Sequence, residues 1–237
     1  MQRYFVNKIE KNTFTLNSDD SYHLLTVMRA KEKDLVEIIY NEETYICTIE
    51  ETTPVVKCLI IEKKEKQDDT IPKVTIAQSL VKEQKMDYVL QKSTELGVDK
   101  IIPLRVKRSI IKLDKNDKKK IDRWQKIVHE ASEQSKRYSI PKVENISDVT
   151  DLINLNYDYK ILCSVNELST TLKKGLQNIS KSDTILIVIG PEGGFDPSEE
   201  ELLINNGFIS VSLGNRVLRT ETASSFVLSV INYIFEE

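Results

Sequence analysis

Two glycine-containing segments in the second half of the chain have the composition of a ligand-binding site. The first reads Ile-Gly-Pro-Glu-Gly-Gly-Phe over residues 189–195, and its three glycines permit a ligand to approach the backbone closely. The second reads Leu-Gly-Asn-Arg-Val-Leu-Arg-Thr-Glu-Thr-Ala over residues 213–223, where Thr220 can cap a helix whose first N–H groups stay free. Neither is a Walker A or a dinucleotide-binding glycine pattern. The alternatives are a tight strand-to-helix turn, and capping beside a surface pair of Arg219 and Glu221.

The net charge of −3 hides an uneven distribution. Residues 1–72 carry 10 basic and 14 acidic side chains (−4), residues 73–145 carry 18 and 10 (+8), and residues 146–237 carry 6 and 13 (−7). The densest stretch, residues 105–123, holds nine Lys or Arg and three Asp. One basic segment on an acidic body is typical of a phosphate-binding face. A solvated, lysine-rich loop and helix start is the alternative.

The composition argues against several classes of protein. The chain has only two histidines, His23 and His129, and three widely spaced cysteines without a CxxC pair, so a zinc site or a Ser-His-Asp hydrolase has little material. We expect buried thiols in a reducing cytosol and therefore a cytoplasmic protein. No apolar run reaches the roughly 18–20 residues of a membrane span, and the charged N-terminus is unlike a signal peptide.

The elements that must position the glycine segments fall into two groups. Residues 35–40, 44–49 and 55–61 are rich in β-branched and aromatic side chains and predict consecutive short strands, hence a small antiparallel sheet or barrel. Residues 18–20 predict the cap of a short helix. The charged segment 63–72, closed by Pro72, is the best linker candidate. The sequence thus predicts domains at 1–70 and 73–237.

The second group alternates between strand and helix patterns. Strands are predicted over residues 74–77, 100–104, 159–163, 184–189 and 208–213, and helices over 80–96, 118–137, from Asp196 onward, and at the C-terminus. This alternation predicts a mostly parallel α/β sheet. Ligands bind outside the carboxyl ends of the strands in such sheets, which is where both glycine segments fall.

Four motifs, and a fifth segment near the N-terminus, carry a resemblance to a known family. They are the two glycine segments, Lys-Ser-Thr-Glu-Leu-Gly-Val (92–98), Arg-Trp-Gln-Lys-Ile-Val-His-Glu-Ala-Ser-Glu-Gln-Ser-Lys-Arg (123–137) and His-Leu-Leu-Thr-Val-Met-Arg (23–29). Together they resemble the bacterial 16S rRNA uridine-N3 methyltransferases, the RsmE family, over nearly the whole chain.

The resemblance implies a fold, a cofactor and partners. The fold is a C-terminal SPOUT methyltransferase domain with a deep trefoil knot, preceded by a PUA-like β-barrel that helps to hold RNA. The cofactor is S-adenosylmethionine, the substrate is 16S rRNA in the 30S subunit, and the enzyme is a homodimer with no metal.

The same resemblance gives the site residues. The cofactor is expected to contact Gly190, Pro191, Glu192, Gly193, Gly194, Leu213, Gly214, Val217, Leu218, Arg219, Thr220, Glu221 and Ala223. A further wall from residues 163–167 is considered, but a plain loop is favoured there. The RNA contacts are expected to be Arg3, Arg29, Lys107, Arg108, Lys112, Arg123 and Arg137. Packing of the barrel is the alternative for Arg3.

The chemistry of uracil suggests the catalytic groups. Uracil N3 is mostly protonated near neutral pH, so its methylation gains from a base or from a cation that stabilises the anionic ring. Arg137 is the first choice for the cation, with a phosphate contact as its alternative. Glu133 and Glu221 are candidates for the base, unless they only orient Arg137 or Arg219.

Two other functions remain open at this stage. One is a non-catalytic ribosome-binding or assembly protein that retains the fold. The other is a SPOUT enzyme with another RNA target, such as tRNA.

Overall fold

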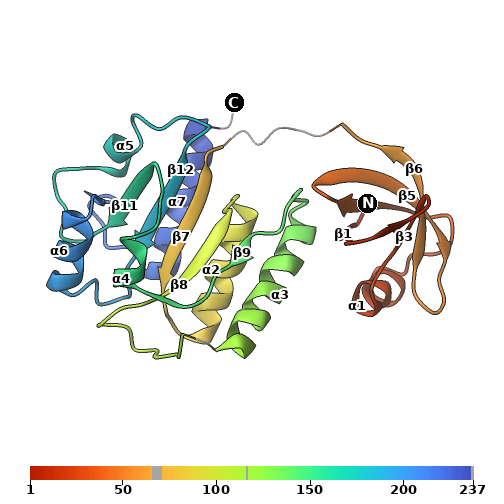
Figure 1. The fold of residues 1–237 in the computed structure, drawn as a ribbon, viewed down its shortest axis with the longest axis horizontal. Helices are drawn as coiled ribbons and strands as arrows, with labels where there is room; N and C mark the ends of the chain where they lie inside the picture. The colour runs from red at the N-terminus through yellow and green to blue at the C-terminus, as the bar shows by residue number, and fades with distance from the viewer. Residues whose placement is uncertain (66–70, 116, 236–237) are drawn as a thin grey trace. The chain divides into compact units, whose positions relative to one another are not determined.

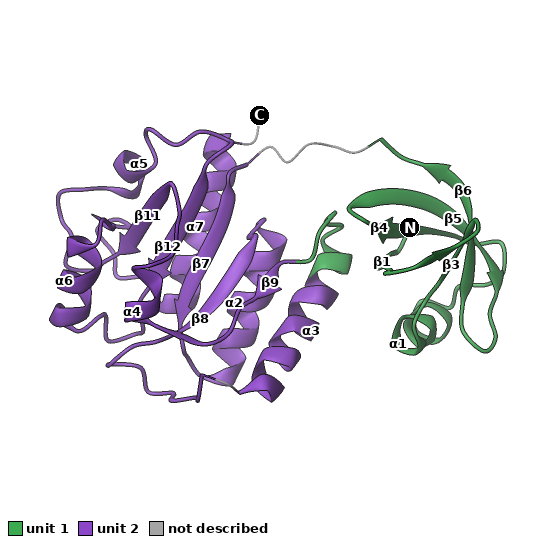
Figure 2. Cartoon of the chain, in the orientation of Figure 1, with its two compact units in different colours: residues 1–68, 132–140 green, residues 69–131, 141–237 purple. Residues whose placement is uncertain are grey.

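The computed structural model of the protein describes residues 1–65, 71–115 and 117–235. The chain divides into two compact units (Figure 2). Unit 1 comprises residues 1–68 and 132–140, and unit 2 comprises residues 69–131 and 141–237. Unit 1 thus takes in a short segment from the middle of the chain. Of the linker expected over residues 63–72, residues 66–70 lie outside the described part.

Unit 1 is built on a curled six-stranded sheet (Figure 1). The strands run in the order β1-β4-β5-β6-β3-β2, and every pair is antiparallel except β1 with β4. Because β1 and β2 do not pair within the described residues, the expected barrel is a half-barrel. Its strands are β1 (Arg3–Phe5), β2 (Ile9–Glu10), β3 (Thr13–Thr15), β4 (Leu35–Tyr40), β5 (Glu43–Glu51) and β6 (Lys57–Lys63).

The hollow side of this sheet holds an apolar core. Phe14 is fully buried and meets Tyr45 edge-on at 5.2 Å between ring centroids. Cys47 and Cys58 belong to the same core, and burial raises the pKa of both thiols to about 12. Both thiols therefore stay protonated at neutral pH and act as small apolar side chains.

A short helical segment follows β3. It consists of α1 (Ser18–Tyr22) and the π-helix η1 (His23–Val27). The cap is Asn17, whose Oδ1 accepts a hydrogen bond from Asp20 N at 2.9 Å, rather than the expected segment 18–20. The error is one residue and leaves the predicted helix in place.

Unit 2 contains a seven-stranded, fully parallel sheet. The order is β10-β8-β7-β12-β11-β13, with β9 pairing β8. The strands are β7 (Lys73–Ser79), β8 (Lys100–Arg105), β9 (Lys142–Val143), β10 (Ser147–Asp148), β11 (Tyr159–Cys163), β12 (Thr184–Ile189) and β13 (Ile209–Val211). The helices are α2 (Glu83–Glu95), α3 (Lys118–Gln134), α4 (Val149–Leu152), α5 (Leu172–Gly175), α6 (Pro197–Asn205) and α7 (Thr220–Phe235).

The apolar strand β12 lies inside this sheet. Leu186 and Val188 join a core that also includes Leu203 of α6, while Ile187 faces the other way and is equally buried. A strand covered on both faces needs apolar residues throughout, which explains the unbroken run over residues 185–189. The predicted α/β fold class is confirmed, and the trefoil knot stays a prediction.

Helix α6 forms as its sequence indicates. Asp196 and Glu199 make a capping box, and Pro197 occupies the first turn. None of the helices in the described ranges combines the length and apolarity needed to cross a membrane.

Candidate functional site

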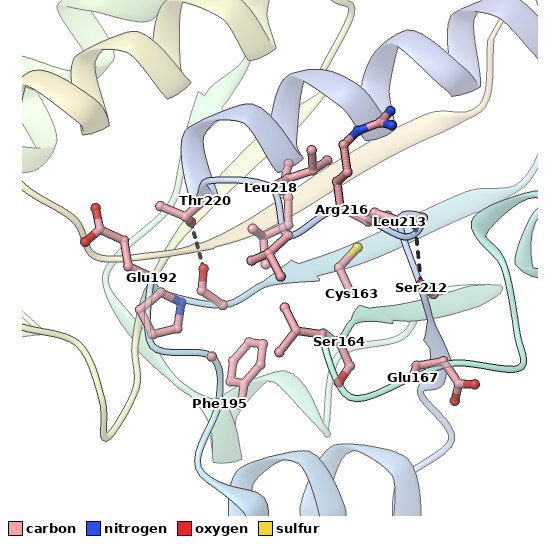
Figure 3. A pocket seen from close by; sticks show the side chains of 18 of the residues that line it. Cys163, Ser164, Glu167, Glu192, Phe195, Ser212, Leu213, Arg216, Leu218 and Thr220 are labelled. Atoms are coloured by element: carbon pink, nitrogen blue, oxygen red, sulfur yellow. Dashed lines mark hydrogen bonds between the residues drawn. The ribbon is translucent and has the colours of Figure 1, made fainter.

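A pocket opens where three neighbouring strands of unit 2 end (Figure 3). The strands β12, β11 and β13 end at Ile189, Cys163 and Val211. The segments that follow them supply the walls, so the two glycine segments meet across one hollow. Ligand sites occur at this edge of parallel sheets.

Most of the expected cofactor residues line this hollow. They are Gly190, Pro191, Glu192, Gly194, Leu213, Gly214, Val217, Leu218, Thr220 and Ala223. Gly193, Arg219 and Glu221 lie outside the lining. Leu218 and Phe195 point inward in Figure 3 and supply apolar surface to a lining that also contains polar side chains.

The glycines keep the backbone of both walls open. A Cβ on Gly190 would lie 2.8 Å from Phe195 Cε2, so a larger residue would displace that ring. Gly194 has φ +67° and donates its N–H to Pro191 O at 3.0 Å, which closes a tight turn. Gly214 has φ +116°, and a Cβ there would meet nothing within 4 Å. Apolar walls with accessible backbone groups fit an adenosine-containing ligand.

The third wall corrects the expectation of a plain loop after β11. Cys163, Ser164, Val165, Glu167 and Leu168 all line the pocket. The sequence carries no distinctive motif there, and only the position after a buried strand hints at such a role.

Two carboxylates fasten this wall. Glu200 of α6 accepts hydrogen bonds from Ser164 Oγ at 2.8 Å and Asn166 Nδ2 at 3.1 Å. Glu167 accepts from both the Oγ and the backbone N–H of Ser169, and these bonds lower its pKa to about 2. Glu167 therefore stays ionised at neutral pH and holds the loop that follows it.

A buried polar network ties the start of α7 to the sheet. Gln78 at the end of β7 donates through Nε2 to Thr220 Oγ1 at 2.8 Å and accepts through Oε1 from Ser224 Oγ at 2.5 Å. Thr220 Oγ1 in turn donates to Gly190 O at 2.7 Å (Figure 3). Thr220 thus connects both glycine segments. Sequence reasoning missed Gln78, although a glutamine at the end of an apolar strand is the signal that could have found it.

A lysine that the sequence did not single out bridges two expected site carboxylates. Lys85 Nζ, in the first turn of α2, donates to Glu192 Oε1 and lies 3.4 Å from Glu221 Oε1. The hydrogen bond lowers the pKa of Glu192 and raises that of Lys85. Glu221 therefore pairs with Lys85 and not, among the described residues, with Arg219. The other oxygen of Glu221, Oε2, is buried without a hydrogen-bond partner in the described structure.

Much of the basic charge over residues 105–123 is neutralised inside unit 2. Arg105 makes a two-pronged pair with Asp148, both contacts at 2.7 Å, and Arg123 makes one with Asp87 at 2.8 and 2.5 Å. Arg123, an expected RNA contact, is therefore engaged by a carboxylate. The formal charge of the segment overstates what it offers to a phosphate backbone.

Other expected RNA contacts differ in their surroundings. Lys107 is exposed, with its Nζ 2.6 Å from Ser198 Oγ and 3.4 Å from Asp196 Oδ1. Arg108 is exposed, and its Nη1 donates to Gly193 O at 3.1 Å. Lys112 and, in unit 1, Arg29 are exposed.

Arg3 is buried in unit 1, where its side chain is 6% exposed. It pairs with Glu37 at 3.0 Å, donates to the carbonyls of Lys136 and Arg137, and lies over the ring of Tyr138. These contacts support the packing alternative for Arg3, which holds segment 136–138 against the half-barrel.

The proposed catalytic residues belong to different units. Glu133, in the last turn of α3, and Arg137, whose Nε donates to Ser139 O at 3.2 Å, lie in unit 1. Glu221 lies in unit 2. Their catalytic roles stay predictions. The described residues contain no group of three or more His, Cys, Asp or Glu side chains placed to hold a metal ion.

The fold and the pocket define the class of protein. A family model described as an RNA methyltransferase domain matches residues 68–232. The ribosomal RNA small subunit methyltransferase E of Bacillus subtilis is 35% identical over 248 residues, covering 98% of this chain and 96% of that protein. The protein of the same name from Mesomycoplasma hyopneumoniae is 32% identical, covering 97% of this chain and 98% of that protein.

Solved structures agree with this likeness over the whole chain. The ribosomal RNA small subunit methyltransferase E from Neisseria gonorrhoeae bound to S-adenosyl methionine is 28% identical with a TM-score of 0.87, covering 99% of this chain and 98% of that one. A putative methyltransferase from Legionella pneumophila in complex with the same cofactor is 28% identical with a TM-score of 0.88. The match covers 98% of this chain and 97% of that one. The chain belongs to the RsmE family of small subunit ribosomal RNA methyltransferases, which confirms the resemblance.

Proposed function

We propose that this protein uses S-adenosylmethionine to methylate N3 of a uridine in the 16S rRNA of the small ribosomal subunit. The observation that carries the proposal is the meeting of both glycine segments around one pocket, in a chain that matches cofactor-bound relatives along its length. The cytoplasm is the expected compartment, and a homodimer is the expected assembly.

The reaction needs no metal or redox partner. The sulfonium carbon–sulfur bond breaks with its electron pair left on sulfur, while a bond forms from uracil N3 to the methyl carbon. The N3 proton leaves to a base. The protein must hold the cofactor, place the uracil in line and help to remove that proton.

The chain's own residues suit these tasks. The backbones of segments 189–195 and 213–218 present polar groups to the adenosine part, and Leu213 and Leu218 supply apolar contact. Glu221, beside Lys85, is the proposed base in unit 2, because its Oε2 is buried with no hydrogen-bond partner in the described residues. Arg137 is the proposed cation for the developing uracil anion.

A transfer assay with three RNA substrates tests the proposal. Purified protein and labelled S-adenosylmethionine are mixed with unmodified 30S subunits, with deproteinised 16S rRNA and with tRNA. Label on 30S rRNA alone is expected. Label on tRNA alone would favour another RNA target, and tight 30S binding without transfer would favour an assembly protein.

A further inference from the structure

A second, shallow pocket lies behind the first glycine segment. It is lined by residues 80–82, Arg108, Ile110, Ile111 and residues 191–193. These segments follow β7, β8 and β12, which are neighbours in the sheet, so this pocket also lies outside the carboxyl ends of parallel strands.

The two pockets share one wall. Pro191 and Glu192 line both of them, so the turn that closes with the Gly194 N–H to Pro191 O bond separates the two hollows. A ligand in the second pocket would therefore lie next to a ligand in the first. This is the arrangement that transfer of a group between two bound molecules requires.

One side of the second pocket is apolar, and its backbone is fixed in place by hydrogen bonds. Ile110 is 76% exposed at the pocket, although it follows a buried serine. That residue, Ser109, has its Oγ 2.5 Å from Leu80 O and 3.1 Å from Ile111 O, which ties the segment after β8 to the segment after β7. An apolar surface held this way suits the flat face of a nucleobase.

The rim of the pocket carries two cations, Lys82 and Arg108, that form no close ion pair within the described residues, although the charge of Lys82 also acts on Glu192. Within the described ranges, neither Lys82 nor Arg108 has a carboxylate oxygen within 4 Å, unlike Arg105 and Arg123. Arg108 Nη1 donates to Gly193 O at 3.1 Å, which orients the guanidinium over the pocket and leaves its other donors available. Glu192, the one carboxylate in the lining, is already bonded to Lys85.

We propose that this second pocket receives the acceptor nucleotide, with the base against Ile110 and Ile111 and a flanking phosphate on Lys82 and Arg108. The inference rests on the proposed function and adds the place where the RNA base enters. An exposed apolar side chain beside two cations suits the base and the flanking phosphate of a nucleotide drawn out of an RNA strand.

Two variants of exposed residues test the pocket without disturbing the core. Ile110→Ser and Arg108→Ala should each lower kcat/KM for 30S methylation by at least about 10-fold, because each removes a contact to the acceptor nucleotide. The affinity for S-adenosylmethionine, measured by calorimetry, should stay within about twofold of the wild type, since neither residue lines the first pocket. Ile204→Ser and Lys173→Ala are the matched controls, because both residues lie outside the two linings, with Ile204 48% exposed and Lys173 exposed.

A crosslinking experiment separates this inference from the proposed function. Unmodified 30S subunits, assembled with 16S rRNA that contains 4-thiouridine, are irradiated with the protein, and the crosslinked peptides are identified. Crosslinks within residues 80–82 or 108–111 are expected whether or not methyl transfer occurs. If transfer proceeds while crosslinks in unit 2 lie only elsewhere, the second pocket does not hold the acceptor. Wild-type kcat/KM for 30S methylation in both Ile110→Ser and Arg108→Ala would also overturn the inference.

Discussion

Gly194 shows how a single backbone conformation shapes the cofactor pocket. Its φ of +67° lies in the left-handed region, where a β-branched residue is strained by about 1–3 kcal/mol. An added Cβ would lie 3.6 Å from Val165 Cγ2, which is ordinary contact. The glycine is therefore required by the turn itself, and not by lack of space.

We expect Gly194→Val to weaken S-adenosylmethionine binding by at least about 10-fold, because the strained turn would shift the backbone groups of the pocket wall. Calorimetry measures the affinity, and thermal unfolding measures the cost to stability. Gly207→Val is the matched control, since Gly207 has φ +86° with no atom within 4 Å of an added Cβ and does not line the pocket. Unchanged cofactor affinity in Gly194→Val would remove this turn from the binding site.

Arg137 belongs to the chemistry of the acceptor in our proposal, and not to cofactor binding. Arg137→Ala is expected to keep the affinity for S-adenosylmethionine and to lose methyl transfer, because the cation that stabilises the uracil anion is gone. Single-turnover transfer to 30S subunits measures the effect. Lys136→Ala removes a charge from the same segment and serves as the control. Wild-type transfer by Arg137→Ala would show that Arg137 has no catalytic role.

At the scale of elements, the polar network of Gln78, Thr220 and Ser224 holds helix α7 against the ends of β7 and β12. All three residues are buried. A buried polar atom that loses its partner costs about 1–3 kcal/mol, so the network fixes one arrangement of the two glycine segments.

We expect Thr220→Val to lower the free energy of unfolding by about 1–3 kcal/mol and to weaken cofactor binding, because Gln78 Nε2 and Gly190 O each lose a hydrogen bond to Thr220 Oγ1. Urea denaturation and calorimetry measure the two effects. Thr75→Val, which removes a hydrogen bond from Tyr157 elsewhere in the sheet, should cost stability and leave binding unchanged. Equal affinity losses in both variants would mean that the network has no special link to the pocket.

The pair of Arg105 and Asp148 joins β8 to β10 and gives stability a dependence on pH. The Arg105 hydrogen bonds, together with the Lys115 ammonium 2.8 Å from Asp148 Oδ2, lower the pKa of Asp148 to about 2, below its ordinary 3.8. A depressed carboxyl pKa contributes stability that is fully present above the unfolded pKa and is lost as the pH falls through the folded one. The free energy of unfolding of Asp148→Asn should therefore lie below that of the wild type by a constant amount above about pH 5. This difference should shrink between about pH 4 and 2. Denaturation at several pH values measures it, with Asp122→Asn as an exposed control, and a deficit independent of pH would contradict the account.

The elements themselves were largely predictable, and the contacts between them were not. Residues 35–40 and 184–189 form strands β4 and β12 at the predicted bounds, because local composition decides a short buried strand. The strands β1 to β3 escaped prediction because two or three residues carry no periodicity. The roles of Gln78, Lys85 and Arg3 depend on partners more than 30 residues away, which no local pattern records.

At the scale of the whole molecule, the charge distribution along the sequence overstates the basic surface that is available to RNA. The segment 105–123 is strongly basic in the sequence, yet several of its cations bind carboxylates. The cations left for RNA include Arg108 and Lys112, which are exposed and have no carboxylate partner within the described residues. We therefore propose that RNA recognition depends on a few placed cations, and not on a diffuse basic face.

The central claim is that this chain builds 3-methyluridine in small-subunit rRNA from S-adenosylmethionine. The most direct measurement is mass spectrometry of nucleosides from unmodified 30S subunits incubated with the wild-type protein and the cofactor, with Gly194→Val in a parallel reaction. The account predicts a 3-methyluridine peak with the wild type that is strongly reduced with the variant. A different methylated nucleoside, or no methylated nucleoside with the wild type, would contradict it.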